Sequence, residues 1–324
     1  MQQFQKYLSL IESAIKRLNF DTTPATLYQP MRFAMSLGGK RLRPLFVLLA
    51  YQLFSKNLRK AIVPALSVEL FHNFTLLHDD IMDQSPTRRG KPTVYSKWNV
   101  PTAILAGDRM LITVYEMLEN LPPEHFHKII PLFNRCAARV CEGQQLDMDY
   151  QTQRIISTED YLKMIRFKTA ELFGYCAELG ATLSGATEYE CHECYQFGIN
   201  IGTSFQILDD VLDTYGDKKL TGKEVGGDIS QNKKTFLLSR AYEKADKNCF
   251  RLLRNTEKKK YSQLQTKVTD IKKIFDTLAV LKDATIEIEK YRSKAMKHLY
   301  NLKKPESRLR PFVLLSDFII KRKY

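Results

Sequence analysis

Residues 71–83 read FHNFTLLHDDIMD, an apolar stretch that ends in three aspartates. Its apolar residues recur at helical spacing, and Asp79 and Asp83 lie one helical turn apart, on one face. Residues 198–213 repeat this design, since a second apolar stretch again ends in the pattern Asp-Asp-x-x-Asp. We therefore expect two helices, each with a cluster of carboxylates near its C-terminal end.

The two clusters contain six aspartates: Asp79, Asp80, Asp83, Asp209, Asp210 and Asp213. Carboxylates this close repel one another, and the dipole at a helix C-terminus disfavours them further. Hard oxygen ligands at this spacing suit Mg²⁺, which takes a few carboxylates together with substrate phosphate oxygens. The alternative is an acidic helix end without a ligand, which leaves this electrostatic cost uncompensated.

Almost every other segment also has helical periodicity, whereas alternating strand patterns and Asn-Gly hairpin turns are missing. We predict polar loops at 84–100 and 215–232, and the two stretches that are apolar around most of their circumference, 60–78 and 188–208, predict buried helices. The sequence thus predicts one all-α domain over 1–324. The expected helices are 2–19, 24–37, 43–55, 60–83, 101–120, 125–148, 158–185, 188–214, 233–254, 259–280, 284–303 and 309–320.

Composition narrows the class of protein. The chain has 324 residues, 44% of them hydrophobic, with only 14 Gly and 12 Pro, which argues against disorder and collagen. No apolar run approaches the ~18 residues of a membrane-spanning helix, and the N-terminus lacks a signal pattern. Six cysteines are too few for a disulfide scaffold. We expect a soluble, cytoplasmic protein with free thiols and no transmembrane segment.

The net charge of +14 is concentrated in residues 241–324, which hold 22 Lys and Arg against 10 Asp and Glu. A solvated face of amphipathic helices explains most such patterns. Nucleic acid, an anionic membrane or a strongly anionic substrate could also attract this charge. No nucleic-acid-binding motif accompanies it, so we expect no nucleic acid partner.

Four basic segments accompany the aspartates: 38–44 (GGKRLRP), 88–93 (RRGKPT), 168–169 (KT) and 221–235 (TGKEVGGDISQNKKT). Each is weak alone, because a surface pair of cations is usually just solvated. Their order and spacing around the two aspartate patterns, from Gly38 to Thr235, resemble the trans-isoprenyl diphosphate synthase (polyprenyl synthase) family, in particular its short-chain members.

The resemblance implies an all-α bundle of about ten or more mostly antiparallel helices around a deep central cavity, usually as a homodimer. It implies a prenyltransferase that joins isopentenyl diphosphate head-to-tail to dimethylallyl, geranyl or farnesyl diphosphate and releases diphosphate. About three Mg²⁺ ions are expected with substrate bound. The released diphosphate is the expected base, because no other group has a clear claim.

The resemblance also assigns roles to individual residues. The implied Mg²⁺ ligands are Asp79, Asp83 and Asp209, with Asp80, Asp210 and Asp213 in support. Isopentenyl diphosphate is implied to bind Lys40, Arg43, His72 and Arg89. The allylic diphosphate is implied to bind Arg88, Lys168, Thr169, Gln206, Lys223 and Lys233. Lys168 and Lys223, like the aspartates, are counted among the catalytic groups, because cations stabilise a departing diphosphate.

Product length in this family is set by bulk beneath the first aspartate motif. Phe74 precedes Asp79 by five residues, about 7 Å along a helix, and Thr75 precedes it by four. With a Phe at this position, the sequence resembles the family members that make products of fifteen to twenty carbons. We predict geranylgeranyl diphosphate, with farnesyl diphosphate as the alternative; Phe74 as an ordinary core residue is the competing interpretation.

Two weaker signals and three other functions stay open. The pattern Cys191-His-Glu-Cys194 invites a zinc or redox interpretation but lacks a second ligand pair, so helix packing is favoured. The basic tail at 321–324 is a hypothetical lid. A class I terpene cyclase, a non-catalytic subunit of a heteromeric synthase and a basic RNA- or membrane-binding protein are the alternatives. Two intact aspartate patterns argue against the cyclase and the non-catalytic subunit. The RNA- or membrane-binding protein would show salt-dependent binding to polyanions and no Mg²⁺-dependent release of diphosphate. Peripheral membrane contact is compatible with an apolar product.

Overall fold

The computed structural model describes residues 2–216, 226–257 and 264–320. Two compact units make up the chain. Unit 1 consists of Met1–Phe133 and Cys176–His192, and unit 2 consists of Asn134–Tyr175 and Glu193–Tyr324. The prediction of one domain over 1–324 stays a prediction.

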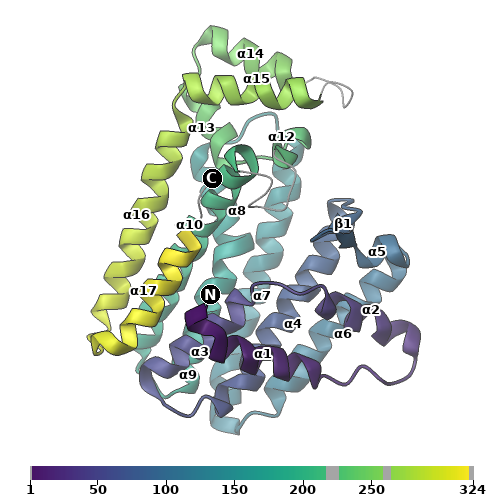
Figure 1. Ribbon diagram of the computed structural model, residues 1–324, viewed down its shortest axis with the longest axis vertical. Coiled ribbons are helices and arrows are strands. Elements are labelled where there is room, and N and C mark those ends of the chain that lie inside the picture. The colour runs from purple at the N-terminus through teal and green to yellow at the C-terminus, as the bar shows by residue number, and fades with distance from the viewer. Residues whose placement is uncertain (1, 217–225, 258–263, 321–324) are drawn as a thin grey trace. The chain divides into compact units, whose positions relative to one another are not determined.

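Unit 1 is built around helix α4, which packs most extensively against α6 and also against α3 and α1 (Figure 1). Apart from one two-stranded hairpin, the elements described in this unit are helical. The helices that begin within Met1–Phe133 are η1 (Gln2–Phe4), α1 (Gln5–Lys16), α2 (Ala25–Ser36), α3 (Leu42–Phe54), α4 (Arg59–Met82), α5 (Val94–Lys97), α6 (Val100–Glu119) and α7 (Pro123–Thr152).

Helix α4 has buried residues on all its sides, among them Ala65, Val68 and Phe71, as its apolar sequence predicted. Burying each large apolar side chain stabilises the fold by roughly 1.5–3 kcal/mol. The helix ends at Met82 and Asp83 caps it, with the Asp83 N–H donating to the carbonyl of Asp79. The first aspartate motif therefore lies at the C-terminus of a buried helix, as expected.

A short hairpin follows the first aspartate motif, within the predicted polar loop. Strands β1 (Thr87–Arg88) and β2 (Lys91–Pro92) pair antiparallel across a two-residue turn. Both turn residues, Arg89 and Gly90, have positive φ, which is what a tight hairpin turn of type I′ requires. Arg88 and Arg89 have different partners: Arg88 binds Asp80, and Arg89 donates to the carbonyl of Gly38.

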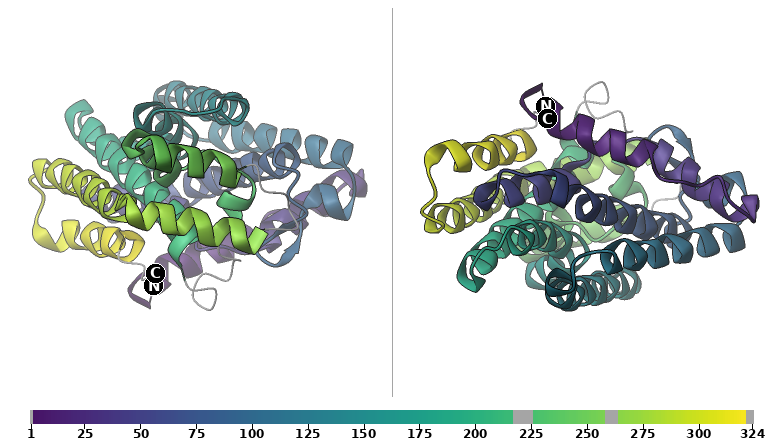
Figure 2. Two further views of the ribbon diagram at one scale, coloured as in Figure 1. Left: turned by 90° about the horizontal axis from the view of Figure 1, so that it is seen from above. Right: turned by 90° about the horizontal axis from the view of Figure 1, so that it is seen from below.

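Unit 2 has a pair of antiparallel helices, α16 and α17, that lie side by side in all three views (Figures 1 and 2). A second pair, α14 and α15, packs together at the top of Figure 1. The remaining helices are α8 (Thr158–Ile165), the π-helix η2 (Arg166–Ala170), α9 (Glu171–Leu183), α10 (Glu188–Tyr215), α12 (Gly227–Ser230), α13 (Phe236–Lys244), α14 (Lys247–Glu257), α15 (Leu264–Thr277), α16 (Val280–Asn301) and α17 (Glu306–Ile320).

The all-α prediction is confirmed, and the differences are local. The expected helix at 158–185 contains a π-helical turn at η2, and the expected helix at 233–254 breaks where Ala245 adopts an extended conformation, with ψ of 126°. The helices α5 and α12 and the small hairpin arise within segments predicted as loops. Within the described part of the chain, none of the helices has the length and apolarity needed to cross a bilayer.

Candidate active site

The first aspartate motif presents its carboxylates in two ways. Asp79 and Asp83 are partly exposed, whereas Asp80 is buried. Arg88 reaches back from β1 and binds one Asp80 oxygen through Nε, at 2.8 Å, and Nη2, at 2.7 Å. Burial raises the pKa of Asp80, and Arg88 opposes that shift by stabilising the charged form. The carboxylate of the middle aspartate is thus bound by a protein side chain, while the outer two aspartates are more exposed to solvent.

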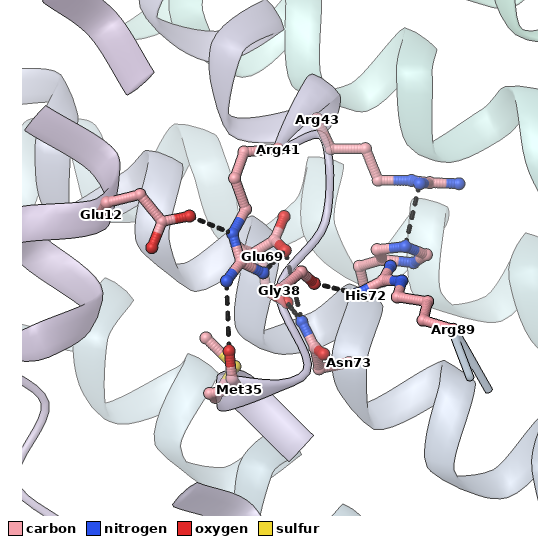
Figure 3. A network of polar contacts seen from close by, with 9 residues as sticks. All are labelled: Glu12, Met35, Gly38, Arg41, Arg43, Glu69, His72, Asn73 and Arg89. Carbon is pink, nitrogen blue, oxygen red and sulfur yellow. Dashed lines mark hydrogen bonds and ion pairs between the residues drawn. The ribbon is translucent and has the colours of Figure 1, made fainter. Parts of the chain in front are cut away.

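A buried arginine organises the loop before α3 (Figure 3). Arg41 donates to Glu12 of α1 at 2.8 Å, to Glu69 of α4 at 2.6 Å and to the carbonyl of Met35 at 3.1 Å. Its φ of 48° is left-handed, and its side chain is 3% exposed. Burial disfavours the charged guanidinium, but Glu69 and Glu12 outweigh burial and raise the pKa of Arg41. Local sequence patterns did not single out this residue, because its partners lie on separate helices.

Three predicted ligands of isopentenyl diphosphate are connected with this loop (Figure 3). Arg43 Nη1 lies 3.0 Å from His72 Nε2, and Arg89 donates to the carbonyl of Gly38. Since arginine can only donate, His72 Nε2 is the acceptor and the ring is neutral, with its proton on Nδ1. Burial and the neighbouring arginines, Arg43 first, lower the pKa of His72 well below its usual value.

Lys40, the fourth predicted ligand, is exposed beside Arg41. It lines a cavity of about 240 Å³ together with α1, through Gln5, Leu8, Ser9 and Glu12, and with Gly39 and Arg41. Burial lowers the pKa of Arg89, which carries charge in this cation-rich region all the same because arginine titrates far above neutral pH. The loop, His72 and the hairpin turn form a region of unit 1 suited to binding an anion.

The second aspartate motif repeats the arrangement of the first. Asp210 is buried, while Asp209 and Asp213 are partly exposed. Asp210 accepts hydrogen bonds from the Tyr161 hydroxyl at 2.5 Å, from Gln206 Nε2 at 3.2 Å and from the Phe236 N–H at 2.9 Å. Burial, followed by the nearby Asp228, raises the pKa of Asp210 well above its usual value.

Asp213 has different partners. The Asp228 N–H donates to Asp213 Oδ2 at 2.9 Å, and the Gly226 N–H donates to the Asp213 carbonyl at 2.7 Å. The segment after the motif therefore folds back onto it.

The Lys168-Thr169 pair lies in the π-helical turn η2. Lys168 Nζ binds the carboxylate of Asp147 on α7, and Thr169 donates to Gln206 Oε1 at 3.0 Å. A Cβ on Gly143 of α7 would lie 2.2 Å from the Lys168 backbone nitrogen, so glycine lets α7 approach this turn. Gln206 thus links the predicted ligand Thr169 to Asp210 in unit 2.

Lys233, also predicted to bind the allylic diphosphate, is partly exposed and donates its N–H to the Asp228 carbonyl at 2.9 Å. Lys223 and the basic tail at 321–324 lie outside the described residues. Sequence analysis missed Tyr161, whose hydroxyl reaches an aspartate 49 residues away. For Asp147, which binds Lys168 from 21 residues away, the pattern Gln-Gln-Leu-Asp at 144–147 was the available signal.

The predicted chain-length residues lie on α4. Phe74 is partly exposed, and its ring contacts the rings of Phe71, with centroids 5.6 Å apart, and His78, with centroids 4.8 Å apart. Thr75 donates to the His72 carbonyl at 2.8 Å. Phe74 therefore belongs to a cluster of rings on α4, and it precedes Asp79, the first residue of the aspartate motif, by more than one helical turn.

The cysteine pattern at 191–194 is part of helix α10. Cys194 is buried, and Glu193 binds Asn301 at 2.8 Å and His298 at 3.1 Å. All six cysteines are free thiols. Across residues 2–216, 226–257 and 264–320, no three His, Cys, Asp or Glu side chains come together as a metal site made by protein ligands alone.

Comparison with known proteins identifies the family. The family model described as polyprenyl synthetase matches residues 24–278, which is most of the chain. The chain belongs to the polyprenyl synthetase family. It is 39% identical over 241 residues to the geranylgeranyl diphosphate synthase of Methanosarcina mazei, covering 74% of each chain. It is 37% identical over 315 residues to the geranylgeranyl pyrophosphate synthase of Geoglobus acetivorans, covering 97% of this chain and 96% of the relative.

The crystal structure of geranylgeranyl pyrophosphate synthetase from Pyrococcus horikoshii Ot3 has the same fold. Its TM-score is 0.91 at 33% identity, with 99% of this chain and 98% of that chain covered. The family resemblance read from the aspartate and basic motifs is therefore confirmed, and this polyprenyl synthetase family member is a prenyltransferase.

Proposed function

We propose that this polyprenyl synthetase family member condenses isopentenyl diphosphate with allylic diphosphates, and that geranylgeranyl diphosphate is its main product. One observation carries the proposal: in both aspartate motifs the middle carboxylate is held by protein donors while the outer carboxylates are partly exposed. The names of the two relatives given above support the twenty-carbon product. Farnesyl diphosphate is the alternative product.

The outer aspartates fit Mg²⁺. This ion is usually bound through one or two carboxylates and completes its coordination with water and substrate phosphates. We propose Asp79, Asp83 and Asp209 as ligands, with about three ions bound alongside substrate. When bound, Mg²⁺ neutralises charge that grows on the departing diphosphate. The hydrogen bonds that Asp80 and Asp210 accept hold each motif in place.

The cationic region of unit 1 suits isopentenyl diphosphate. Lys40, Arg43 and Arg89 would bind the diphosphate. The neutral ring of His72 can donate through Nδ1 without adding a further cation among the arginines, because Arg43 occupies its Nε2. The hydrogen bond from Arg89 to Gly38 and the ion pairs of Arg41 pre-organise the loop, which lowers the cost of binding.

The allylic diphosphate is proposed to bind Lys168, Thr169, Gln206 and Lys233, as well as Arg88 and Lys223. Lys168 is held by Asp147 until an anion competes for its ammonium group. Preorganised cations stabilise the charge of a leaving diphosphate better than water does, because they need no reorientation during the reaction. The allylic cation then reacts with the double bond of isopentenyl diphosphate, and released diphosphate takes the proton.

Product length is proposed to depend on Phe74. The residue lies five positions before Asp79 on α4, about 7 Å deeper along the helix axis. Contacts with Phe71 and His78 limit how far its ring can turn aside. A bulky, braced ring at this depth suits a product that stops at twenty carbons, and Thr75 is the next candidate.

A homodimer is proposed from the surface of α6. Exposed apolar side chains gather there: Ile104, Leu105, Ile112 and Tyr115. Leu105 is 59% exposed and Ile112, two turns later, is 53% exposed. Exposed apolar side chains gathered on one helix suit an interaction site, and two copies related by a twofold axis would cover them. Leu105→Lys should shift the protein to monomer in sedimentation velocity, whereas Leu252→Lys, on exposed α14, should not.

The direct test is an assay of the purified protein with Mg²⁺, isopentenyl diphosphate and each of dimethylallyl, geranyl and farnesyl diphosphate, followed by separation of products by length. We expect a twenty-carbon diphosphate. Activity should vanish with EDTA and return with Mg²⁺. Asp79→Asn and Asp209→Asn should each abolish turnover, while Asp108→Asn, an exposed aspartate of α6, should leave it intact.

Other outcomes separate the alternatives. A fifteen-carbon product would replace geranylgeranyl with farnesyl diphosphate and leave the chemistry unchanged. Release of diphosphate from an allylic substrate alone, with a cyclic hydrocarbon product, would indicate a class I terpene cyclase. A folded protein that binds Mg²⁺ and yields no product with any primer would refute the proposal and favour a partner subunit.

A further inference from the structure

A buried lysine in the basic C-terminal region lies against the segment that follows the second aspartate motif. Lys267 of α15 is only 2% exposed. Its amino group donates to Asn232 Oδ1 at 2.6 Å and lies 3.5 Å from the Ser230 carbonyl. Lysine is almost never fully buried unless it is paired. Most of the Lys and Arg that the structure describes in this region are exposed, so this one needs a separate explanation.

The next residue of α15 contacts the other end of the same segment. A Cβ on Gly226 would lie 2.7 Å from both methyl carbons of Val268, and Gly226 has φ of +83°. Only glycine fits this position, because the left-handed backbone and the close valine both exclude a side chain. Lys267 and Val268 therefore hold residues 226–232 at both ends.

This segment in turn contacts Asp213, of the second aspartate motif, and leads into Lys233, a proposed ligand of the allylic diphosphate. Its first residues donate to Asp213: the Gly226 N–H to the carbonyl and the Asp228 N–H to Oδ2, at 2.7 and 2.9 Å. Its end leads into Lys233, whose N–H donates to the Asp228 carbonyl at 2.9 Å. A continuous chain of contacts thus runs from Lys267 to Asp213 and Lys233, all within unit 2.

The surroundings of Lys267 leave little room for a different arrangement. Asn232 has φ of 54°, a left-handed conformation that its side-chain bond to Lys267 supports. The cavity beside these residues, lined also by Glu257 and Lys233, has about 10 Å³. That is about the space of one water molecule. Burial lowers the pKa of Lys267, and the carboxylate of Glu257 opposes this shift.

We infer that Lys267 is a positioning residue: it holds segment 226–233 in the conformation in which Asp213 and Lys233 serve the allylic diphosphate. The inference rests on the proposed function. It assigns a task within the reaction to α15, which carries none of the motif residues. The inference predicts an effect on the allylic substrate in particular, because segment 226–233 belongs to unit 2, whereas the proposed isopentenyl diphosphate ligands belong to unit 1.

The test is Lys267→Met, which keeps the length of the side chain and removes its charge. Losing a hydrogen bond from a charged group should shift the equilibrium of segment 226–233 away from the conformation that Lys267 stabilises by about tenfold or more. We expect KM for farnesyl diphosphate to rise about tenfold while KM for isopentenyl diphosphate changes little. Lys273→Met, on the exposed side of α15, is the matched control and should change neither constant.

A second variant guards against a folding defect in α15. Asn232→Gly accepts the left-handed backbone but deletes the acceptor of the Lys267 bond, so it should raise the same KM. Because both variants break one interaction, the double variant should be no worse than the worse single one. Circular dichroism and thermal midpoints establish that each variant is folded.

Three results would overturn the inference. The first is an unchanged KM for farnesyl diphosphate in folded Lys267→Met or Asn232→Gly. The second is an equal rise of both KM values, which would indicate a general structural role. The third is full additivity of the two substitutions. A wild-type protein without synthase activity would instead refute the proposed function on which the inference rests.

Discussion

Replacing Arg41 with methionine should destabilise unit 1 severely, for a reason that the ion pairs around it make explicit. The side chains of Arg41 and Glu69 are 3% and 4% exposed, and their closest atoms are 2.6 Å apart. Methionine fills the same volume but leaves the Glu69 carboxylate buried without its cation. Asn73 Nδ2, at 3.4 Å, would remain as a donor to that oxygen, but it carries no charge.

Breaking a buried ion pair by removing one partner costs about 3–5 kcal/mol, because the remaining charge has lost both water and its partner. The left-handed backbone at position 41 adds little to the difference, since arginine and methionine pay the same conformational cost there. The second substitution, Glu69→Met, removes the stranded charge. The double variant should therefore recover most of the loss, because replacing a whole buried pair with apolar side chains is often neutral.

Trp98, the one tryptophan of the chain, makes the measurement specific to unit 1. Its ring lies 5.3 Å from that of Phe33, so its fluorescence reports on the packing of this unit during urea unfolding. The control is Arg32→Met, which breaks a surface pair with Asp21 and should cost less than about 1 kcal/mol.

The reasoning fails if Arg41→Met costs no more than Arg32→Met. It also fails if the free energies of the two single substitutions at Arg41 and Glu69 simply add, since a shared ion pair requires strong coupling.

Three further predictions concern single side chains. Because the pKa of His72 is depressed in the folded protein, the unfolded chain takes up a proton as pH falls through about 6.5, whereas the folded chain does not, so stability is lost below that pH. In urea unfolding, His72→Gln should lessen the loss of stability between pH 7.5 and 5.5. The control His127→Gln, at an exposed position, should not lessen it. Phe74→Ala should extend the main product beyond twenty carbons by chromatography, and Phe74→Leu should keep it; unchanged length in both would remove Phe74 from the product site. Tyr161→Phe deletes a hydrogen-bond donor to Asp210 and should lower the free energy of unfolding in urea by about 1–3 kcal/mol. Tyr189→Phe, at an exposed position, is the control and should hardly change that free energy.

Helical periodicity was enough to predict most of the secondary structure. The helices around both aspartate motifs end within about two residues of the predicted positions, because apolar spacing and end signals act within one or two turns. The π-helical turn at η2 had no such signal. There α7 approaches through Gly143, 25 residues earlier than Lys168, and the local sequence contains no trace of that contact.

In the site, too, contacts between residues far apart in the sequence left no local signal. The carboxylates that face one way on a helix follow from spacing alone, so Asp79 and Asp83 could be paired from the sequence. Nothing local shows that Asp80 is bound by Arg88, or that Arg41 has two carboxylate partners on two different helices.

The sequence by itself determined the helices, the two aspartate motifs and the family, because these depend on residues a few positions apart. Only the tertiary structure decided which aspartate of each motif is buried, which histidine stays neutral and which lysine backs the second motif. Asp210 is bound by Tyr161 from 49 residues away, and Lys267 by Asn232 from 35 residues away. Burial and charge at such positions are set by side chains that only packing brings together, and the free energy of each depends on that surrounding.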